Sequence, residues 1–438
     1  MEEQSTLGRA LSSVMEVGRD LLVKRGLASP PGTSAGDALA AMCHDLLHHR
    51  GEASGLALAG EILETYGQLD EAGREAFFLL LAREFDVDPT QIGLAADAYL
   101  ANPDQDNLAA MSKAVEAPRV KLFRRINMAP NGTRVLVGMR GHLLPLVRKH
   151  AELAAVDTDL KHLFISWFNK GFLELRRVDW SAPAFELEKI IDYEAVHEIN
   201  GWSDLRSRLG EDRRCFAFFH PALAHDPLVF VEVALTDEMP SAIAPLLKED
   251  RDPIVGREAN TVVFYSISNC HAGLAGISFG NFLIKNVVEE LRKEMPWLKT
   301  FVTLSPVPGF RRWLEQAEPT ELDQLIDPNL VDKVRQPIGR VVEADVAEAL
   351  QRLCAHYLVN EKSGELLAKD PVARFHLGNG AHLHRLHWAA DLTAKGRQQS
   401  AGIMVNYLYD LDKIEVNHEA YFDEGKISAS KAVTKLIP

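Results

Sequence analysis

Apolar residues in the first third of the chain recur at intervals of three or four positions. Three segments follow this spacing: DALAAMCHDLLHHRG at 37–51, SGLALAGEILETYGQ at 54–68 and DEAGREAFFLLLAREFDV at 70–87. Such spacing gathers apolar side chains on one face and predicts amphipathic helices. No strand-like alternation appears before about residue 130. We therefore predict an all-α N-terminal domain over 1–160, of a kind that commonly serves in packing and oligomerisation.

From about residue 160 onward, short runs rich in Val and Phe alternate with helical segments. The strand-like runs are CFAFFHP at 215–221, LVFVEVALT at 228–236, TVVFYSISN at 261–269, TFVTLS at 300–305 and GIMVNYLYDL at 402–411. Helical spacing appears at 278–296 and at 346–360. Strands interleaved with helices predict a mixed α/β domain over 161–438, so the whole chain is expected to be α+β.

The charge balance narrows the classes of partner. The 438 residues include 48 Lys and Arg against 62 Asp and Glu, a formal net charge of −14. Nucleic-acid binding requires a basic surface, so no nucleic-acid partner is expected. Residues 119–150 reverse the trend, with eight Lys or Arg and no acidic residue. This basic stretch is interpreted either as a solvated or subunit-facing pair of helices or as a wall that attracts an anion.

Cysteine usage and the N-terminal segment bear on location. The four cysteines are scattered and form no C-x-x-C pair, which is typical of neither a disulfide framework nor a zinc ribbon. The N-terminal segment lacks a basic stretch followed by an apolar run, so no secretory signal is predicted. No run approaches the roughly 18 apolar residues of a membrane span. We expect a cytoplasmic protein without membrane attachment.

The segment from Gly276 to Gly280 reads Gly-Ile-Ser-Phe-Gly, which is literally the G-x-S-x-G pattern of α/β-hydrolases. A nucleophile elbow follows its strand at once, whereas residues 269–275 intervene here. Together with Gly273, the same glycines also suit a loop whose backbone N–H groups approach a phosphate at the start of a helix. The sequence matches neither a Walker A loop nor G-x-G-x-x-G. A glycine-rich turn without a ligand remains a third interpretation.

Ser305 in LSPVPGF and His376 in FHLGNGA are the candidate catalytic residues. A hydroxyl at the end of a strand, followed by two rigid prolines, is well placed for catalysis in an α/β fold, although a plain strand-terminating turn is the alternative. His376 precedes Gly378–Gly380, a turn that is expected to present the imidazole to a cleft, and His is a natural proton donor near neutral pH.

Histidines are otherwise predicted to be structural. Four of them fall within twelve residues: His376, His382, His384 and His387. No Asp, Glu or Cys completes a recognisable ligand set there, and His44 with His48 on a predicted helix also lacks a third ligand. We predict no metal site.

Eight blocks, in this order and combination, resemble the malonyl-CoA decarboxylase family. They are ISWFNKGFLELRRVDW, EAVHEINGWSDLRSRLG, RRCFAFFHP, VFYSIS, FGNFLIKNVVEEL, LSPVPGF, DPVARFHLGNGA and GIMVNYLY. Together they cover most of residues 164–410. The N-terminal third resembles the family less distinctly, mostly in LFRRINMAPNGTRVLVGMRGHLLPLV at 122–147.

The resemblance implies a catalytic domain similar to the GNAT acyltransferase superfamily, preceded by a helical domain that assembles a homo-oligomer, either a dimer or a tetramer. In that superfamily a loop between a central strand and a helix binds the CoA pyrophosphate through backbone amides. The matching residues are Ala275, Gly276, Ile277, Ser278, Phe279, Gly280 and Asn281. This implication favours the phosphate loop over the nucleophile elbow. Ser278 departs from relatives that carry an acid there, and the R/Q-x-x-G-x-G/A loop signature is degenerate.

The family's catalytic pair maps onto Ser305 and His376, with Tyr409 in VNYLY and Ser266 in FYSIS as supporting residues of the substrate site. The implied reaction converts malonyl-CoA to acetyl-CoA and CO2 through an enolate. Ser305 would orient the carboxylate and His376 would donate the proton. No cofactor is expected, because the thioester is itself the electron sink.

Three other functions remain open: a CoA-dependent acyltransferase, a thioester hydrolase and a non-catalytic helical assembly protein. Because the substrate is an anion and the chain is acidic, the binding loop is expected to need local positive potential. The basic residues nearest the matched motifs, and therefore the expected source, are Lys285, Arg311, Arg312 and Arg397.

Overall fold

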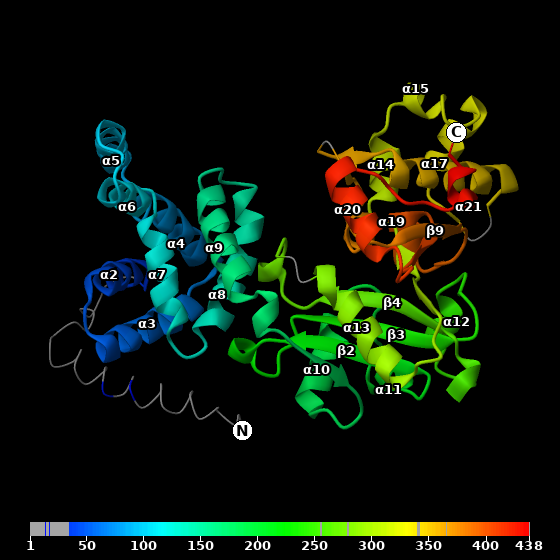
Figure 1. The fold of residues 1–438 in the computed structure, drawn as a ribbon, viewed down its shortest axis with the longest axis horizontal. Coiled ribbons are helices and arrows are strands. Elements are labelled where there is room, and N and C mark those ends of the chain that lie inside the picture. Colours follow the sequence, from blue (N-terminus) through cyan, green and yellow to red (C-terminus); the bar gives the residue numbers. More distant parts are fainter. Residues whose placement is uncertain are drawn as a thin grey trace. The chain divides into compact units, whose positions relative to one another are not determined.

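The fold is taken from a computed structural model of the 438-residue chain (Figure 1). The described residues are Val14, Val17, 35–254, 256–277, 280–339, 342–364 and 366–437. They form two compact units. Unit 1 comprises the described residues up to Leu173 together with His220–Ala224 and His271–Ile277, and unit 2 comprises the rest.

Unit 1 is helical. Its α-helices are α2 (Ala35–His48), α3 (Glu52–Gly67), α4 (Glu71–Glu84), α5 (Pro89–Ala101), α6 (Gln105–Ala114), α7 (Pro118–Asn127), α8 (Gly132–Val147) and α9 (Leu153–Trp167). Unit 1 also contains three short 3-10 helices: η1 (Lys170–Phe172), η2 (Pro221–Leu223) and η4 (Ala272–Leu274). Asp70, Asp88 and Asp104 accept backbone N–H bonds at the starts of α4, α5 and α6, so side-chain caps set where these helices begin.

The core of unit 1 lies between α2, α3, α4, α7, α8 and α9, whose apolar faces are buried against one another. Its fully buried side chains include Leu39, Phe78, Leu81, Leu122, Phe123, Ile126, Leu136, Leu143, Val156, Leu160 and Phe164. The helices α5 and α6 differ, because neither contains a buried residue. They form a hairpin, drawn in cyan in Figure 1, whose Leu94 and Leu100 are 60% and 78% exposed.

Unit 2 is built on a mixed sheet. Its strands are β1 (Glu174–Val178), β2 (Arg213–Phe219), β3 (Val229–Thr236), β4 (Thr261–Asn269), β5 (Thr300–Thr303), β6 (Ser305–Pro306), β9 (His382–His387) and β10 (Met404–Leu408). The order is β1-β2-β3-β4-β5-β10-β6, with β9 paired to β10. Only the β4–β5 pair is parallel among the described strands. The short strands β7 (Lys362–Ser363) and β8 (Leu367–Ala368) form a separate hairpin.

Helices cover this sheet and extend from it (Figure 1). They are α10 (Ala184–Tyr193), α11 (Trp202–Arg208), α12 (Ala244–Leu247), α13 (Gly280–Glu294), α14 (Phe310–Gln316), α15 (Pro319–Leu322), α16 (Val331–Arg335), α17 (Ala344–Val359), α18 (Pro371–Gly378), α19 (Ala394–Ser400), α20 (Ile414–Glu424) and α21 (Lys431–Thr434), with the 3-10 turns η3 (Gly256–Glu258) and η5 (Pro328–Leu330). Leu187 and Ile190 of α10 pack with Ala217 and Phe219 of β2. Leu283, Val287 and Leu291 of α13 are buried, as its apolar stripe predicts.

The predicted fold class is confirmed, because a helical N-terminal region is followed by a domain of strands and helices. Two local predictions differ from the structure. Helix α9 continues through position 160, where the sequence suggested the domain boundary, since its apolar stripe runs on through Leu163 and Phe164. His376 lies within α18 and is 3% exposed, whereas the glycines after it suggested a turn that opens into a cleft.

Candidate active site

Ser305 lies just after β5, where the chain stops pairing with β4 and pairs with β10 alone. The chain leaves β5 at Thr303, and the Leu304 N–H donates to the Phe264 carbonyl of β4 at 3.0 Å. Ser305 then pairs with Val405 of β10 in β6. The two prolines that follow, at 306 and 308, cannot donate backbone hydrogen bonds, so the ladder stops and the chain turns into α14. The hydroxyl therefore stands at the end of a buried strand, as predicted.

Asp370 ties His376 to this turn. Its carboxylate accepts the N–H groups of Val372 and Ala373, which caps α18, and its second oxygen accepts the Gly309 N–H at 3.0 Å. Asp370 is fully buried, and burial raises its pKa. The Asp370 side chain thus fixes the start of the helix that carries His376 relative to the turn after Ser305.

Ser305, His376 and Tyr409 form one hydrogen-bonded chain, which we call the imidazole chain. The Ser305 Oγ lies 3.1 Å from the His376 Nε2, and the His376 Nδ1 lies 2.8 Å from the Tyr409 hydroxyl. Ser305 also donates to the Thr303 Oγ1 at 2.9 Å. Since the serine proton points to Thr303, the geometry assigns Nε2–H to donate to Ser305 and Nδ1 to accept from Tyr409.

Burial keeps the imidazole chain neutral. Desolvation lowers the pKa of His376 to about 3, so its imidazole is uncharged near neutral pH. Burial also raises the pKa of Tyr409, so the phenol keeps its proton. The Tyr407 ring stacks on the His376 imidazole with centroids 4.7 Å apart and planes inclined by 25°. The arrangement can hold an acyl group by hydrogen bonds in dry surroundings and can move one proton.

Ser266 lies in a different cluster of hydroxyls. Its Oγ is 2.7 and 2.8 Å from the two carboxylate oxygens of Glu194, and Ser268 donates to the same carboxylate at 3.2 Å. The Glu194 carboxylate also accepts the N–H groups of Val196 and His197. Ser266 follows a β-bulge, because the pairing with β3 shifts register between Glu232 and Val233. Its hydrogen-bond partners, Glu194 and Ser268, belong to this cluster and not to the imidazole chain.

The predicted phosphate loop divides between the two units. Ala275, Gly276 and Ile277 follow η4 in unit 1, whereas Gly280 and Asn281 begin α13 in unit 2. Ser278 and Phe279 lie outside the described residues. The described part of the loop is ordered by hydrogen bonds, because the Ile277 N–H donates to the Leu274 carbonyl at 3.0 Å.

The remaining histidines make structural contacts. His382 bonds to Ser428, and His387 bonds to the amide oxygen of Asn406 at 2.6 Å. His44 pairs with Glu84, and His48 bonds to the His44 carbonyl. No group of three or more His, Cys, Asp or Glu suited to a metal ion occurs among the described residues. In the same part of the chain, no helix is long and apolar enough to cross a membrane.

Three of the four basic residues expected around the loop, Lys285, Arg311 and Arg397, have structural partners. Lys285 pairs with Glu415, and Arg397 donates to the Leu392 carbonyl. Arg311 is only 6% exposed and donates to the Val334 and Arg335 carbonyls, so its expected role as a basic rim is wrong. Much of the basic stretch 119–150 is likewise bonded within unit 1, as Arg119 is to Asp86 and Asp159.

Sequence reasoning missed several residues that build the site. Thr303 accepts the Ser305 hydroxyl and the Tyr407 N–H, and Asn406 donates to the Thr303 carbonyl. Tyr407 supplies the ring on the imidazole. Asn406 and Tyr407 lie within the block GIMVNYLY, but that block did not single them out, and Thr303 lies outside the quoted blocks. The only available signal was their position, since Thr303 stands two residues before Ser305 and Tyr407 two before Tyr409, on the same strand faces.

Comparison with known proteins adds an independent observation. A family model described as "Malonyl-CoA decarboxylase C-terminal domain" matches residues 171–438, and one described as "Malonyl-CoA decarboxylase N-terminal domain" matches residues 85–168. Mitochondrial malonyl-CoA decarboxylase from the goose Anser anser anser is 34% identical over 418 residues, covering 86% of this chain and 83% of the goose protein. The rat protein, Rattus norvegicus, is 36% identical over 417 residues, covering 86% and 84%.

Solved structures agree. The crystal structure of malonyl-CoA decarboxylase from Rhodopseudomonas palustris is similar with a TM-score of 0.87 and 49% identity, covering 92% of this chain and 100% of that one. The structure of the Agrobacterium vitis protein is similar with a TM-score of 0.83 and 49% identity, covering 91% and 99%.

Proposed function

Because the chain belongs to the malonyl-CoA decarboxylase family, we propose that it decarboxylates malonyl-CoA to acetyl-CoA at the imidazole chain of Ser305, His376 and Tyr409. The observation that carries this proposal is the pair of contacts at His376. Its Nε2 lies 3.1 Å from the Ser305 hydroxyl and its Nδ1 lies 2.8 Å from the Tyr409 hydroxyl.

Decarboxylation of malonyl-CoA depends mainly on how the substrate carboxylate is oriented relative to the thioester. When the malonyl carboxylate is turned out of the thioester plane, the electron pair of the breaking C–C bond passes to the thioester carbonyl and CO2 leaves. The resulting enolate takes one proton at its α-carbon to give acetyl-CoA. The thioester therefore supplies its own electron sink, and we propose that no metal, biotin or pyridoxal cofactor takes part. The protein must orient the malonyl carboxylate, partly desolvate it and stabilise the negative charge that develops on the enolate oxygen.

Ser305 is proposed to orient the carboxylate. Ser305 is 6% exposed and its hydroxyl is hydrogen-bonded on two sides, so the position of the hydroxyl is determined before substrate arrives. A carboxylate that replaces the Thr303 contact would receive a short, charge-assisted hydrogen bond. Few competing water molecules reach such a buried group, which keeps the carboxylate partly desolvated.

His376 is proposed to supply the proton. Its pKa near 3 makes it neutral without substrate, because burial disfavours the imidazolium. An anionic carboxylate beside it favours the protonated form and raises that pKa. A proton is then taken up with the substrate and delivered to the α-carbon of the enolate. This sequence balances the reaction, which consumes one proton for each CO2 released.

Two further residue assignments belong to this proposal. Ala275–Asn281 are proposed to bind the CoA pyrophosphate through backbone N–H groups, and Ser266 is proposed to support the substrate site. Support for the loop comes from Gly276, which is exposed and whose N–H has no acceptor among the described residues, whereas the Ala275 N–H donates to the Ala272 carbonyl. Support for Ser266 comes from its position next to the bulge in β4, where a strand is locally free of regular pairing.

We also propose a homo-oligomer, either a dimer or a tetramer, assembled through unit 1. The hairpin of α5 and α6 supports this proposal, because it has no buried residue and exposes Leu94, Leu100 and Leu108. Apolar side chains on a projecting helical hairpin suit a second copy of the chain. A cytoplasmic location remains part of the proposal, although the names of the goose and rat relatives place those proteins in mitochondria. Cell fractionation would separate the two.

The decisive experiment follows the products. The purified protein is incubated with malonyl-CoA, and release of CO2 and formation of acetyl-CoA are measured together. Equal amounts of both are expected. Free CoA without acetyl-CoA would identify a thioester hydrolase, and dependence on an added amine would identify an acyltransferase. Absence of any turnover would refute the proposal.

A further inference from the structure

Arg140 of α8 is a buried cation that holds the loop described above. It is 2% exposed, and its Nη1 donates to the carbonyls of Gly273 at 2.7 Å and Ala275 at 2.8 Å. Its Nε donates to the Asp157 carboxylate of α9 at 2.7 Å, which balances the buried charge. All four residues belong to unit 1.

These bonds determine which way one peptide group of the loop points. Leu274–Ile277 form a type II turn: Ala275 has φ −56° and ψ 131°, Gly276 has φ +75°, and the Ile277 N–H closes the turn on Leu274. In a trans peptide the carbonyl and the following N–H point in opposite directions. Because Arg140 binds the Ala275 carbonyl, the Gly276 N–H must point away from Arg140. Gly276 is exposed, and no acceptor for this N–H is found among the described residues.

Helix α8 also limits how far the loop can move. A methyl group on Gly273 would lie 1.8 Å from the Val137 carbonyl oxygen, and one on Gly141 would lie 3.5 Å from the Gly273 nitrogen. The two backbones therefore approach as closely as glycine permits. The loop is held both by hydrogen bonds and by backbone packing, so its amide has a stable position.

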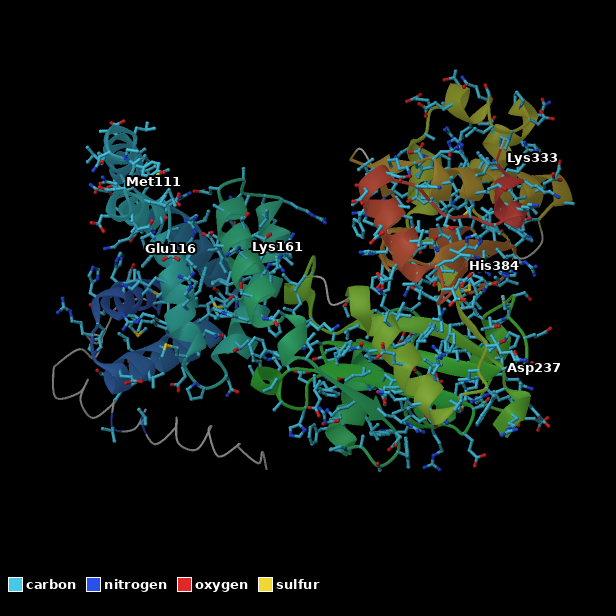
Figure 2. All side chains as sticks on the ribbon, viewed as in Figure 1. Met111, Glu116, Lys161, Asp237, Lys333 and His384 are labelled. Carbon is cyan, nitrogen blue, oxygen red and sulfur yellow. The ribbon has the colours of Figure 1, made fainter. Side chains whose placement is uncertain are left out.

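Lys161 of α9 places a positive charge beside this amide. A methyl group on Gly276 would lie 3.5 Å from the Lys161 Nζ and 3.7 Å from its Cε. The nearby carboxylate of Asp157, one turn earlier on α9, is bonded to Arg140. Among the described residues, no acceptor or acid pairs with the Lys161 ammonium group. Figure 2 labels Lys161 on α9.

We propose that the Lys161 ammonium and the Gly276 N–H, held in place by Arg140, together bind a phosphate group of the CoA ester. This inference rests on the proposed function, and all three residues belong to unit 1. Lys161 is a binding residue and Arg140 a positioning residue. An ammonium and an oriented amide are the groups that hold phosphate oxygens in proteins. The phosphate belongs either to the pyrophosphate or to the ribose 3′-phosphate.

The test compares substrates with and without phosphate. Lys161→Ala should raise the KM for malonyl-CoA about tenfold and leave kcat unchanged, because a charge-assisted bond is lost from binding alone. Lys161→Arg should restore most of the affinity. Lys113→Ala, which removes an exposed lysine of α6 in the same unit, should behave as wild type. With malonyl-pantetheine, which has no phosphate, the KM of Lys161→Ala and wild type should agree.

A second variant tests the peptide orientation. Gly276→Ala should raise the KM for malonyl-CoA, because φ of +75° disfavours alanine and the peptide would turn its N–H inward. Gly276→Asn should raise it less, since asparagine tolerates a left-handed backbone. Malonyl-dephospho-CoA separates the two sources. If the Lys161 effect persists with it, the pyrophosphate is bound; if the effect vanishes, the 3′-phosphate is bound.

The outcomes that overturn the inference are distinct from those that overturn the function. An unchanged KM in Lys161→Ala, or an equal change with malonyl-pantetheine, would refute phosphate binding while decarboxylation continued. If wild type releases no CO2 from any substrate, the function fails instead. Calorimetric titration with acetyl-CoA then still measures Lys161 directly, and equal affinities of wild type and Lys161→Ala would reject the inference.

Discussion

The imidazole chain in unit 2 and the cluster of Arg140, Asp157 and Lys161 in unit 1 are both partly or wholly buried, but they differ in charge. The first consists of a hydroxyl, a phenol and an imidazole that burial keeps neutral. The second contains two cations against one carboxylate. Before substrate binds, the neutral, dry site offers the carboxylate hydrogen bonds but no fixed cation, whereas a phosphate that stays charged is best held by cations. The difference in charge is consistent with the proposed roles: the imidazole chain carries out the decarboxylation, and the cluster with Lys161 binds phosphate.

The largest effect is expected from replacing His376, which should abolish most of the catalysis but leave substrate binding unchanged. His376→Ala should lower kcat on the order of 100-fold or more, because the enolate loses its proton donor, while the KM for malonyl-CoA changes little. His384→Ala is the matched control: His384, labelled in Figure 2, lies on β9, and its ring contacts His382 rather than a residue of the imidazole chain. Steady-state kinetics measures kcat and KM, and circular dichroism spectra check that each variant is folded. A kcat near wild type would remove His376 from the role.

A smaller effect is expected from the phenol. Tyr409→Phe keeps the ring but removes the O–H that bonds to the His376 Nδ1, and kcat should fall about tenfold because the imidazole loses an oriented partner. Tyr407→Phe is a close control. The Tyr407 ring also touches the imidazole, but its buried hydroxyl has no hydrogen-bond partner among the described residues. Equal losses in the two variants would show that the loss in Tyr409→Phe does not come from its hydrogen bond to His376.

The smallest effect concerns stability and tests whether the imidazole chain is neutral. The pKa of His376 is about 3 in the folded protein and 6.5 for an unperturbed imidazole, so the unfolded chain binds a proton that the folded chain excludes. The free energy of unfolding should therefore fall as pH decreases from about 6.5 towards 3, by up to about 1.4 kcal/mol per pH unit from this residue. His376→Gln should show a shallower decrease in urea unfolding between pH 7 and pH 5. An identical slope would mean that His376 is not held neutral.

Local patterns accounted for much of the fold. The three-four spacing in 37–51 and 54–68 predicted α2 and α3, and the run 261–269 coincides with β4. Ser305 was predicted at the end of a strand because Pro306 and Pro308 follow it, and it lies there. His376 was selected by type and by resemblance, but its setting was misjudged. Gly378–Gly380 end the helix in a turn, but His376 lies inside α18 and is buried, because Asp370 and Pro371 had already started the helix upstream.

Residue type, periodicity and the breaks at Pro and Gly act over a few neighbouring positions, so the sequence alone was sufficient for the elements and for Ser305 and His376 as candidates. Tyr409 became a candidate only through the family resemblance. The contacts that give these residues a chemistry join distant positions: 71 residues separate Ser305 from His376, and 135 separate Arg140 from Ala275. No local pattern encodes such pairs. Packing brought them together, removed water from His376, which lowered its pKa, and left Lys161 beside Gly276 while engaging Lys285 and Arg311 elsewhere.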